Sequence, residues 1–165
     1  MIEHDTPDTL CPVTLSQSVA GDRWNLLILR EIFLGNLRFE QIQAHTGATP
    51  QILTVRLKRL EANGMVERRL YSERPPRHEY RPTAKGEAFH AVLLTLRAWG
   101  EGWCKAPGAE RAVEYIHCDC EGLAGLGPAC AACGAPVEWK DLRAEPGVAY
   151  GKEREARWRA FKARR

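Results

Sequence analysis

Five residues that can bind a metal lie close together near the C-terminal end of the chain. The stretch HCDCEGLAGLGPACAACG, residues 117–134, contains His117, Cys118, Cys120, Cys130 and Cys133. A Cys-x2-Cys pair followed by glycine is typical of a zinc knuckle, because the turn directs two thiolates at one ion. Cys130 and Cys133, followed by Gly134, have this spacing. The stretch therefore predicts a structural Zn²⁺ site.

The other half of this site leaves two possibilities. His117 and Cys120 repeat the spacing of the knuckle, whereas Cys118 and Cys120 form a rival pair. We favour the set His117, Cys120, Cys130 and Cys133. Four protein ligands leave no open coordination position for water, so the metal would be structural rather than catalytic. The alternative is a ribbon that keeps its cysteines without binding a metal.

Cysteine usage and segment length agree with a metal site. Four of the six cysteines fall within residues 118–133, and such clustering in an intracellular protein favours a metal over disulfide bonds. A segment of roughly thirty residues, 113–142, is too short to bury a core of its own, so a metal would organise it. The rest of the chain should stay folded without that metal.

Composition restricts the class of protein. With 165 residues, 44% of them hydrophobic and 27% charged, the chain suits one globular domain and a small appendage. No apolar run is long enough to cross a bilayer, and the N-terminus MIEHDTPDTL is polar. We therefore expect no signal peptide, no membrane partner and a cytoplasmic location.

The positive charge is concentrated in two stretches. Residues 54–85 contain nine Lys and Arg against four Glu, and residues 152–165 contain seven against two, although the net charge is only +3. Basic stretches on an otherwise acidic body suit a polyanion such as DNA. A solvated surface of an ordinary globular domain is the simpler alternative.

Apolar periodicity and capping residues predict the elements that carry these charges. Asp22 and Thr49 are expected helix caps, and Pro12 and Pro50 suit first helical turns. The expected helices span residues 12–20, 23–34, 38–46, 50–63 and 84–103. Residues 65–72 and 78–83 are expected strands around the loop ERPPR, residues 1–10 an arm, residues 104–111 and 144–151 linkers, and residues 152–165 a basic helix or a disordered tail.

The order of these elements predicts a winged helix-turn-helix. The short turn HTGATP lets the third and fourth helices cross steeply, which turns the outer face of the fourth helix towards a DNA major groove. Gln51 could make a bidentate contact with adenine. The candidate DNA contacts are Thr49, Gln51, Thr54, Arg56, Lys58 and Arg59 on this helix, and Arg74 and Arg77 in the wing loop.

Residues 11–99 resemble the HxlR-type winged helix-turn-helix transcriptional regulators of bacteria. The matching motifs are CPV, WNLLILREIFLGNLRFEQI, ILTVRLKRLEANGMVERRLY, PPRHEYRPTAKG and a late WG. Pro50 and Gln51 stand where the family often has serine and lysine, so base preference cannot be carried over. The resemblance implies a homodimer that binds double-stranded operator DNA. We expect a mainly α fold with a small β-wing in residues 11–104, a zinc-ribbon-like appendage in residues 113–142 and a basic tail in residues 150–165.

The predicted function is a sequence-specific, homodimeric DNA-binding regulator, a repressor on a pseudo-palindromic operator, with an unknown effector. Leu15, Val19 and the helix face from Phe89 to Trp99 are the expected dimer contacts. Two alternatives remain open. Cys11 stands where some members of the family sense oxidants, although it could be a small buried side chain, and a winged helix can also bind proteins. No Ser/His/Asp arrangement, phosphate loop or HExxH motif is present, so we expect no enzyme.

Overall fold

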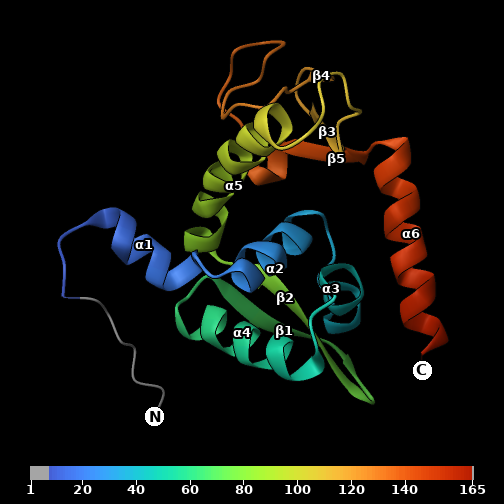
Figure 1. The fold of residues 1–165 in the computed structure, drawn as a ribbon. Helices are drawn as coiled ribbons and strands as arrows, with labels where there is room; N and C mark the ends of the chain where they lie inside the picture. Colours follow the sequence, from blue (N-terminus) through green and yellow to red (C-terminus); the bar gives the residue numbers. More distant parts are fainter. Residues whose placement is uncertain (1–7, 165) are drawn as a thin grey trace. The chain divides into compact units, whose positions relative to one another are not determined.

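The computed structural model describes residues 8–164 (Figure 1). Residues 1–7 of the expected arm and Arg165 of the expected tail therefore lie outside the described residues. The chain divides into two compact units, Met1–Thr83 and Ala84–Arg165, which we describe in turn. Among the described residues, no helix combines the length and apolar character needed to cross a membrane.

Residues 8–83 of the first unit form four helices and a hairpin, in the predicted order. These are α1 Pro12–Ala20, α2 Arg23–Phe33, α3 Phe39–Thr46, α4 Pro50–Ala62, β1 Val66–Glu73 and β2 Pro76–Pro82. The predicted caps are confirmed, because Asp22 accepts a hydrogen bond from the Trp24 N–H at 2.9 Å and Thr49 accepts one from the Ile52 N–H at 3.3 Å. Gly47 ends α3 with a left-handed φ of 72°, a conformation that favours glycine.

Helix α4 packs its leucine side against the other helices. Leu53, Leu57 and Leu60 are all at most 1% exposed, and α4 contacts α2, α3 and β1 (Figure 1). The side chains that α2 and α3 bury most completely are Ile28, Leu29, Ile32 and Ile42. Because residues three and four apart share one side of a helix, this burial leaves the opposite side of α4 facing outward.

The wing is a longer hairpin than the sequence predicts. Strands β1 and β2 pair antiparallel from Val66 with Pro82 to Glu73 with Pro76, with an irregularity between Leu70 and Ser72. Only two residues, 74 and 75, then remain between the strands, so the predicted loop ERPPR was too long. Pro76 is compatible with a strand because it occupies the first position, where proline is tolerated.

The second unit begins with a long helix, as predicted. Its elements are α5 Ala84–Trp103, β3 Val113–His117, β4 Gly122–Leu123, the short 3-10 helix η1 Trp139–Asp141, β5 Leu142–Pro146 and α6 Val148–Ala163. The three strands form an antiparallel sheet in the order β4-β3-β5. A tail that the sequence left as either helix or disordered is helical over the described residues.

The predicted linker at residues 144–151 was wrong, because it contains the end of β5 and the first turn of α6. The carboxylate of Glu110 accepts hydrogen bonds from the N–H groups of Val148 at 2.6 Å and Ala149 at 3.1 Å. These are N–H groups that a helix start leaves without partners inside the helix. A cap supplied from so far along the chain leaves no local sequence signal.

Candidate DNA-binding face and metal centre

The outward side of α4 presents side chains suited to a DNA groove. Gln51, Thr54 and Lys58 are exposed there, opposite the buried leucines. Val55, which the sequence analysis did not select, is 61% exposed on the same helix. An apolar side chain on a recognition helix can contact the methyl group of thymine. The signal that could have found Val55 is its position one turn after Gln51.

Two of the predicted DNA contacts also hold the first unit together. Arg56 Nη2 lies 3.2 Å from Asp22 Oδ2, and its side chain is only 25% exposed. Arg59 Nη2 donates a hydrogen bond to the Ser18 carbonyl at 3.0 Å. Both guanidinium groups therefore tie α4 to α1 and to the start of α2. Counting charges along the sequence does not distinguish these arginines from Lys58.

The predicted basic wing is located at the hairpin tip. Arg74 lies between the strands, and Arg77 is the second residue of β2; both are exposed. Another arginine near the wing has an aromatic neighbour: Arg38 lies 4.5 Å from the ring centre of Tyr71. Arg74 and Arg77 thus provide positive charge at the exposed tip of the hairpin.

The predicted metal ligands meet in the second unit. His117, Cys120, Cys130 and Cys133 place their ligand atoms within 4.8 Å of one another. His117 Nδ1 is 3.4 Å from both Cys120 Sγ and Cys133 Sγ, and Cys120 Sγ is 3.7 Å from Cys130 Sγ. Tetrahedral Zn²⁺ with ordinary bond lengths separates two sulfurs by about 3.8 Å and a sulfur from a nitrogen by about 3.5 Å. The donor set and its spacing fit this ion.

The fold determines which residues join this group. His117 ends β3, and Cys120 lies in the turn that leads to β4. Close packing explains Gly122, because a methyl group there would meet the Ala132 side chain at 2.5 Å and Cys120 Sγ at 3.3 Å. Cys118, the rival ligand, has an exposed side chain and lies outside the group. The geometry therefore favours His117 over Cys118.

The surroundings of Cys130 and His117 favour metal binding, whereas at Cys120 the Gly122 N–H is outweighed by desolvation and the neighbouring thiols, which raise the pKa of that thiol. Desolvation opposes ionisation of Cys130, but the N–H groups of Cys133 and Ala132 lower the pKa of its thiol to about 7. His117 directs Nδ1 at the thiols, whereas its Nε2 lies 3.8 Å from Asp119 Oδ2. A carboxylate on the outer nitrogen is a common way to orient a histidine ligand.

Cys11 precedes α1 and is exposed. The backbone N–H of Thr14, with smaller contributions from the Thr14 hydroxyl and the Val13 N–H, lowers the pKa of the Cys11 thiol. A thiol at a helix N-terminus gains thiolate character in this way. The alternative of a small buried side chain is wrong for this structure, since Cys11 is exposed.

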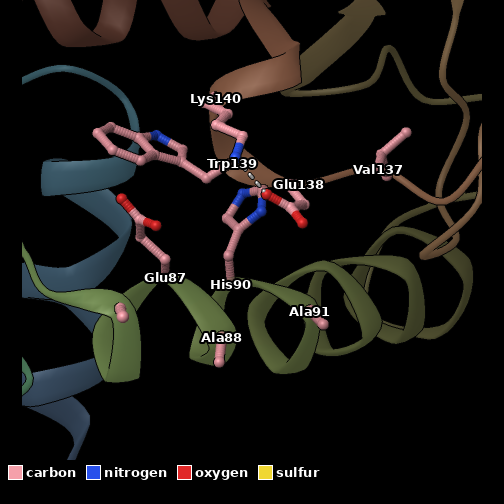
Figure 2. A pocket seen from close by; sticks show the side chains of 9 residues that line it. Glu87, Ala88, His90, Ala91, Val137, Glu138, Trp139 and Lys140 are labelled. Carbon is pink, nitrogen blue, oxygen red and sulfur yellow. Dashed lines mark ion pairs between the residues drawn. The ribbon is translucent and has the colours of Figure 1, made fainter.

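Helix α5 also borders a cavity of about 260 Å³. Figure 2 shows His90 pointing from α5 towards residues 137–140, where Glu138 and Lys140 form an ion pair at 2.8 Å. Burial, and then the charge of Arg97, lower the pKa of His90 to about 4. The imidazole of His90 is therefore neutral at physiological pH. The cavity separates part of α5 from residues 137–140.

Comparison with known proteins agrees with the predicted resemblance. The family model of the HxlR-like helix-turn-helix matches residues 19–107, more than half of the chain. An uncharacterized HTH-type transcriptional regulator of Synechocystis sp. is 35% identical over 120 residues, covering 72% of this chain and 82% of that protein. The HTH-type transcriptional regulator YodB of Bacillus subtilis is 40% identical over 106 residues, covering 61% and 91%.

Solved structures show the same fold. PA1607, described as a candidate transcription factor, has a TM-score of 0.65 at 32% identity over 82% of this chain and 94% of that chain. The redox regulator HypR in its oxidized form has a TM-score of 0.54 at 30% identity over 58% of this chain and all of that chain. Together with the order of α2, α3, α4 and the wing, these matches show that the chain belongs to the HxlR-like helix-turn-helix family.

Proposed function

We propose that this chain is a sequence-specific DNA-binding transcriptional regulator. The observation that carries the proposal is the exposed row Gln51, Val55 and Lys58 on α4, directly opposite leucines that anchor the helix. Such a row can read base edges in a major groove while the positive N-terminus of the helix attracts phosphate. On this proposal the chain works at the nucleoid in the cytoplasm, and it is not an enzyme.

The proposed contacts divide into two kinds. Thr49, Gln51, Thr54 and Val55 are placed to touch bases or adjacent phosphates, whereas Lys58, Arg74 and Arg77 supply charge to the backbone. Arg56 and Arg59 reach DNA only with the part of each guanidinium that Asp22 and Ser18 leave accessible. A regulator bound over an operator excludes polymerase from that DNA, so we propose repression.

A homodimer explains an exposed apolar stripe on α5. Val92, Leu96 and Trp99 are 51%, 47% and 58% exposed, and with Phe89 and Trp103 they alternate at spacings of three and four residues. This is the spacing of a helix seam that packs against another helix. In the proposed dimer, to which Leu15 and Val19 of α1 also contribute, two recognition helices about 34 Å apart match successive major grooves of a pseudo-palindromic operator.

We also propose one structural Zn²⁺ held by His117, Cys120, Cys130 and Cys133. Thiolates and a neutral imidazole are ligands that zinc prefers, and the distances among these four groups support the proposal. When bound, the ion would supply cross-linking of the turn after β3 to the knuckle that contains Cys130.

A second candidate function is redox sensing through Cys11. Two features favour it, the exposed thiol with a lowered pKa and the similarity to a protein described as a redox regulator. Oxidation of a thiolate next to α1 would alter a helix that we place in the dimer interface. If the chain does not bind DNA, the remaining hypothesis is that its winged helix contacts only other proteins.

Base reading and backbone contact are separable by substitution. Gln51→Ala should cost about 1–3 kcal/mol at one base position and relax the preference there. Arg77→Ala should weaken binding to all sequences and reduce the slope of log K against log salt by about 1. Gel shifts with the chain's own upstream DNA test both, with Arg143→Ala in the second unit as the matched control. An unchanged operator preference for Gln51→Ala would mean that the proposed helix register is wrong.

The dimer proposal predicts a position-specific effect on α5. Leu96→Glu buries a charge in the proposed seam and should produce a monomer at micromolar concentration, because an unpaired buried charge is strongly unfavourable. Thr95→Glu, one residue along and exposed, should remain dimeric. Light scattering compares the two variants. A monomeric wild-type chain, or equal behaviour of both variants, contradicts the proposed seam.

The zinc proposal predicts one equivalent of metal per chain purified without chelator, as measured by elemental analysis. His117→Ala should release this metal readily because it removes a ligand, whereas Cys118→Ala should retain it. Metal content well below one equivalent in the wild-type chain would indicate a ribbon that has lost its ion. If only Cys118→Ala released the metal, Cys118 rather than His117 would be the fourth ligand.

The redox candidate predicts preferential reaction of Cys11. At neutral pH, iodoacetamide should modify Cys11 faster than Cys104, which is also exposed, because the thiolate is the reacting species. Peptide mapping by mass spectrometry at short times measures both rates in the same chain. Equal rates, or an oxidant response that survives Cys11→Ser, would remove this candidate.

A further inference from the structure

Helix α5 has two sides with different roles. One side carries the exposed stripe that contains Val92, Leu96 and Trp99. The other side faces the C-terminal ribbon, which we define as residues 113–146, and there Leu94 and His90 are each only 3% exposed. His90 meets the ring of Tyr115 edge-on, at 6.2 Å between ring centres. The proposed dimer helix is thus also the base on which the ribbon sits.

Arg97 joins this helix to the ribbon. Its guanidinium donates hydrogen bonds to the carbonyls of Val113 and, at 3.2 Å, of Gly125. It also lies 4.8 Å from the ring centre of Tyr115. Desolvation lowers the pKa of Arg97, although an arginine remains charged at any physiological pH. Hydrogen bonds of a charged donor in such surroundings are stronger than those between neutral groups.

A second set of contacts continues the connection beyond Arg97. The Glu101 carboxylate accepts hydrogen bonds from the Ala112 N–H at 3.1 Å and from Lys105 Nζ at 2.7 Å. Lys105 also donates to the carbonyl of Glu110, the residue that caps α6. Polar contacts from Glu101 and Lys105 therefore hold the last residues of the chain segment that precedes β3.

The carbonyls that Arg97 binds lie close along the chain to the metal ligands. Val113 begins β3, the strand that ends at His117. Gly125 follows Ala124, whose N–H donates to the Tyr115 carbonyl at 2.8 Å and whose carbonyl accepts from the Ala131 N–H at 3.0 Å. Ala131 lies next to the ligand Cys130. The Val113 carbonyl is held by the pairing of β3 with β5, whereas the position of the Gly125 carbonyl depends on order in the loop that contains Cys130.

Packing alone does not seat the ribbon on α5. The cavity of about 260 Å³ lies between α5 and residues 137–140 (Figure 2), so part of this junction lacks the close contact of a protein core. The polar contacts of Arg97 add to the burial of Leu94 and Tyr115 at this junction. Contacts of this kind depend on the geometry of their acceptors, and the metal would fix that of the Gly125 carbonyl.

We propose that a thiophilic divalent cation at His117, Cys120, Cys130 and Cys133 acts as an effector that controls dimerisation through Arg97. The inference rests on the proposed function, because it requires both the metal and the α5 seam. Loss of the ion disorders the ligand loops, withdraws the Gly125 carbonyl from Arg97 and loosens the contact of α5 with the ribbon. The unit Met1–Thr83 keeps its own core and stays folded. Metal therefore changes the affinity between two copies of the chain, and through it the affinity for an operator.

Sedimentation of the full chain tests the coupling. Removal of zinc with a chelator should weaken dimerisation by at least about tenfold, within the usual range of allosteric coupling. Arg97→Met should still bind one equivalent of zinc, dimerise weakly with the metal bound, and lose little more on chelation. Arg97→Lys keeps the charge but not the forked guanidinium donor. It serves as a second, more conservative test in case Arg97→Met does not fold. Arg159→Met, on the exposed surface of α6, is the control and should behave as wild type.

The coupling between metal binding and dimerisation can be measured in a second way, which would show no effect if the metal had only a structural role. If metal strengthens dimerisation, dimerisation must strengthen metal binding by the same factor. Competition with a chromophoric chelator should therefore give a tighter zinc affinity at protein concentrations above the dimer dissociation constant than below it, and Arg97→Met should abolish the difference.

Two kinds of result overturn the inference and can be told apart. A zinc-loaded wild-type dimer whose dissociation constant is unchanged by metal removal overturns the coupling alone. A wild-type chain that binds no metal overturns it together with the proposed zinc site, and one that is monomeric with metal bound overturns it together with the proposed dimer.

Discussion

The burial of one side of α4 is the constraint on which the recognition surface depends. Leu53, Leu57 and Leu60 can leave water only by packing against α2, α3 and β1, and each such side chain contributes about 1.5–3 kcal/mol when fully buried. Once that side is fixed, the helix period leaves Gln51, Val55 and Lys58 facing outward. Arg56 and Arg59 add polar ties to Asp22 and Ser18 at the margins of the same seam. The geometry of the proposed DNA-reading face is thus a by-product of hydrophobic packing on its opposite side.

The second unit is built on different physics. It buries fewer apolar side chains than the first unit, namely Leu94, Val113, Tyr115, Ala124, Cys130 and Val137 among the described residues, so hydrophobic burial contributes less per residue. Directed contacts take its place, from the thiol and imidazole group, from Arg97 and from the Glu110 cap of α6. Such contacts are sensitive to position and charge, whereas a packed core is largely indifferent to solution conditions. A division of this kind lets one part of a regulator respond while the other part keeps its shape.

The features that could be predicted from the sequence are those with local causes. Asp22 and Thr49 accept helix-capping hydrogen bonds from N–H groups two and three residues further along the chain. The grouping of the proposed metal ligands follows from the spacing of the pairs His117 with Cys120 and Cys130 with Cys133. What could not be predicted depends on residues far apart in sequence. Asp22 and Ser18 draw two expected DNA contacts inward, and Glu110 begins a helix in a stretch that looks like a linker. The wing was misjudged for a different reason, since Pro76 discourages a strand in general yet is tolerated at its first position. Exposed Val55 was overlooked because apolar residues on a helix are usually assigned to the core.

Helix α5 has consequences for how such a chain can diverge. Arg97 is suited to its place only because backbone carbonyls of the ribbon accept its protons. A descendant that lost the ribbon would keep a cation on a helix face with nothing to bind, and an apolar or neutral replacement would then be favoured. Conversely, gain of a ribbon without the arginine would leave two carbonyls unpaired. The appendage and this single side chain should therefore be inherited or lost together, which makes an arginine at this point of the long helix a marker for relatives that carry such a ribbon.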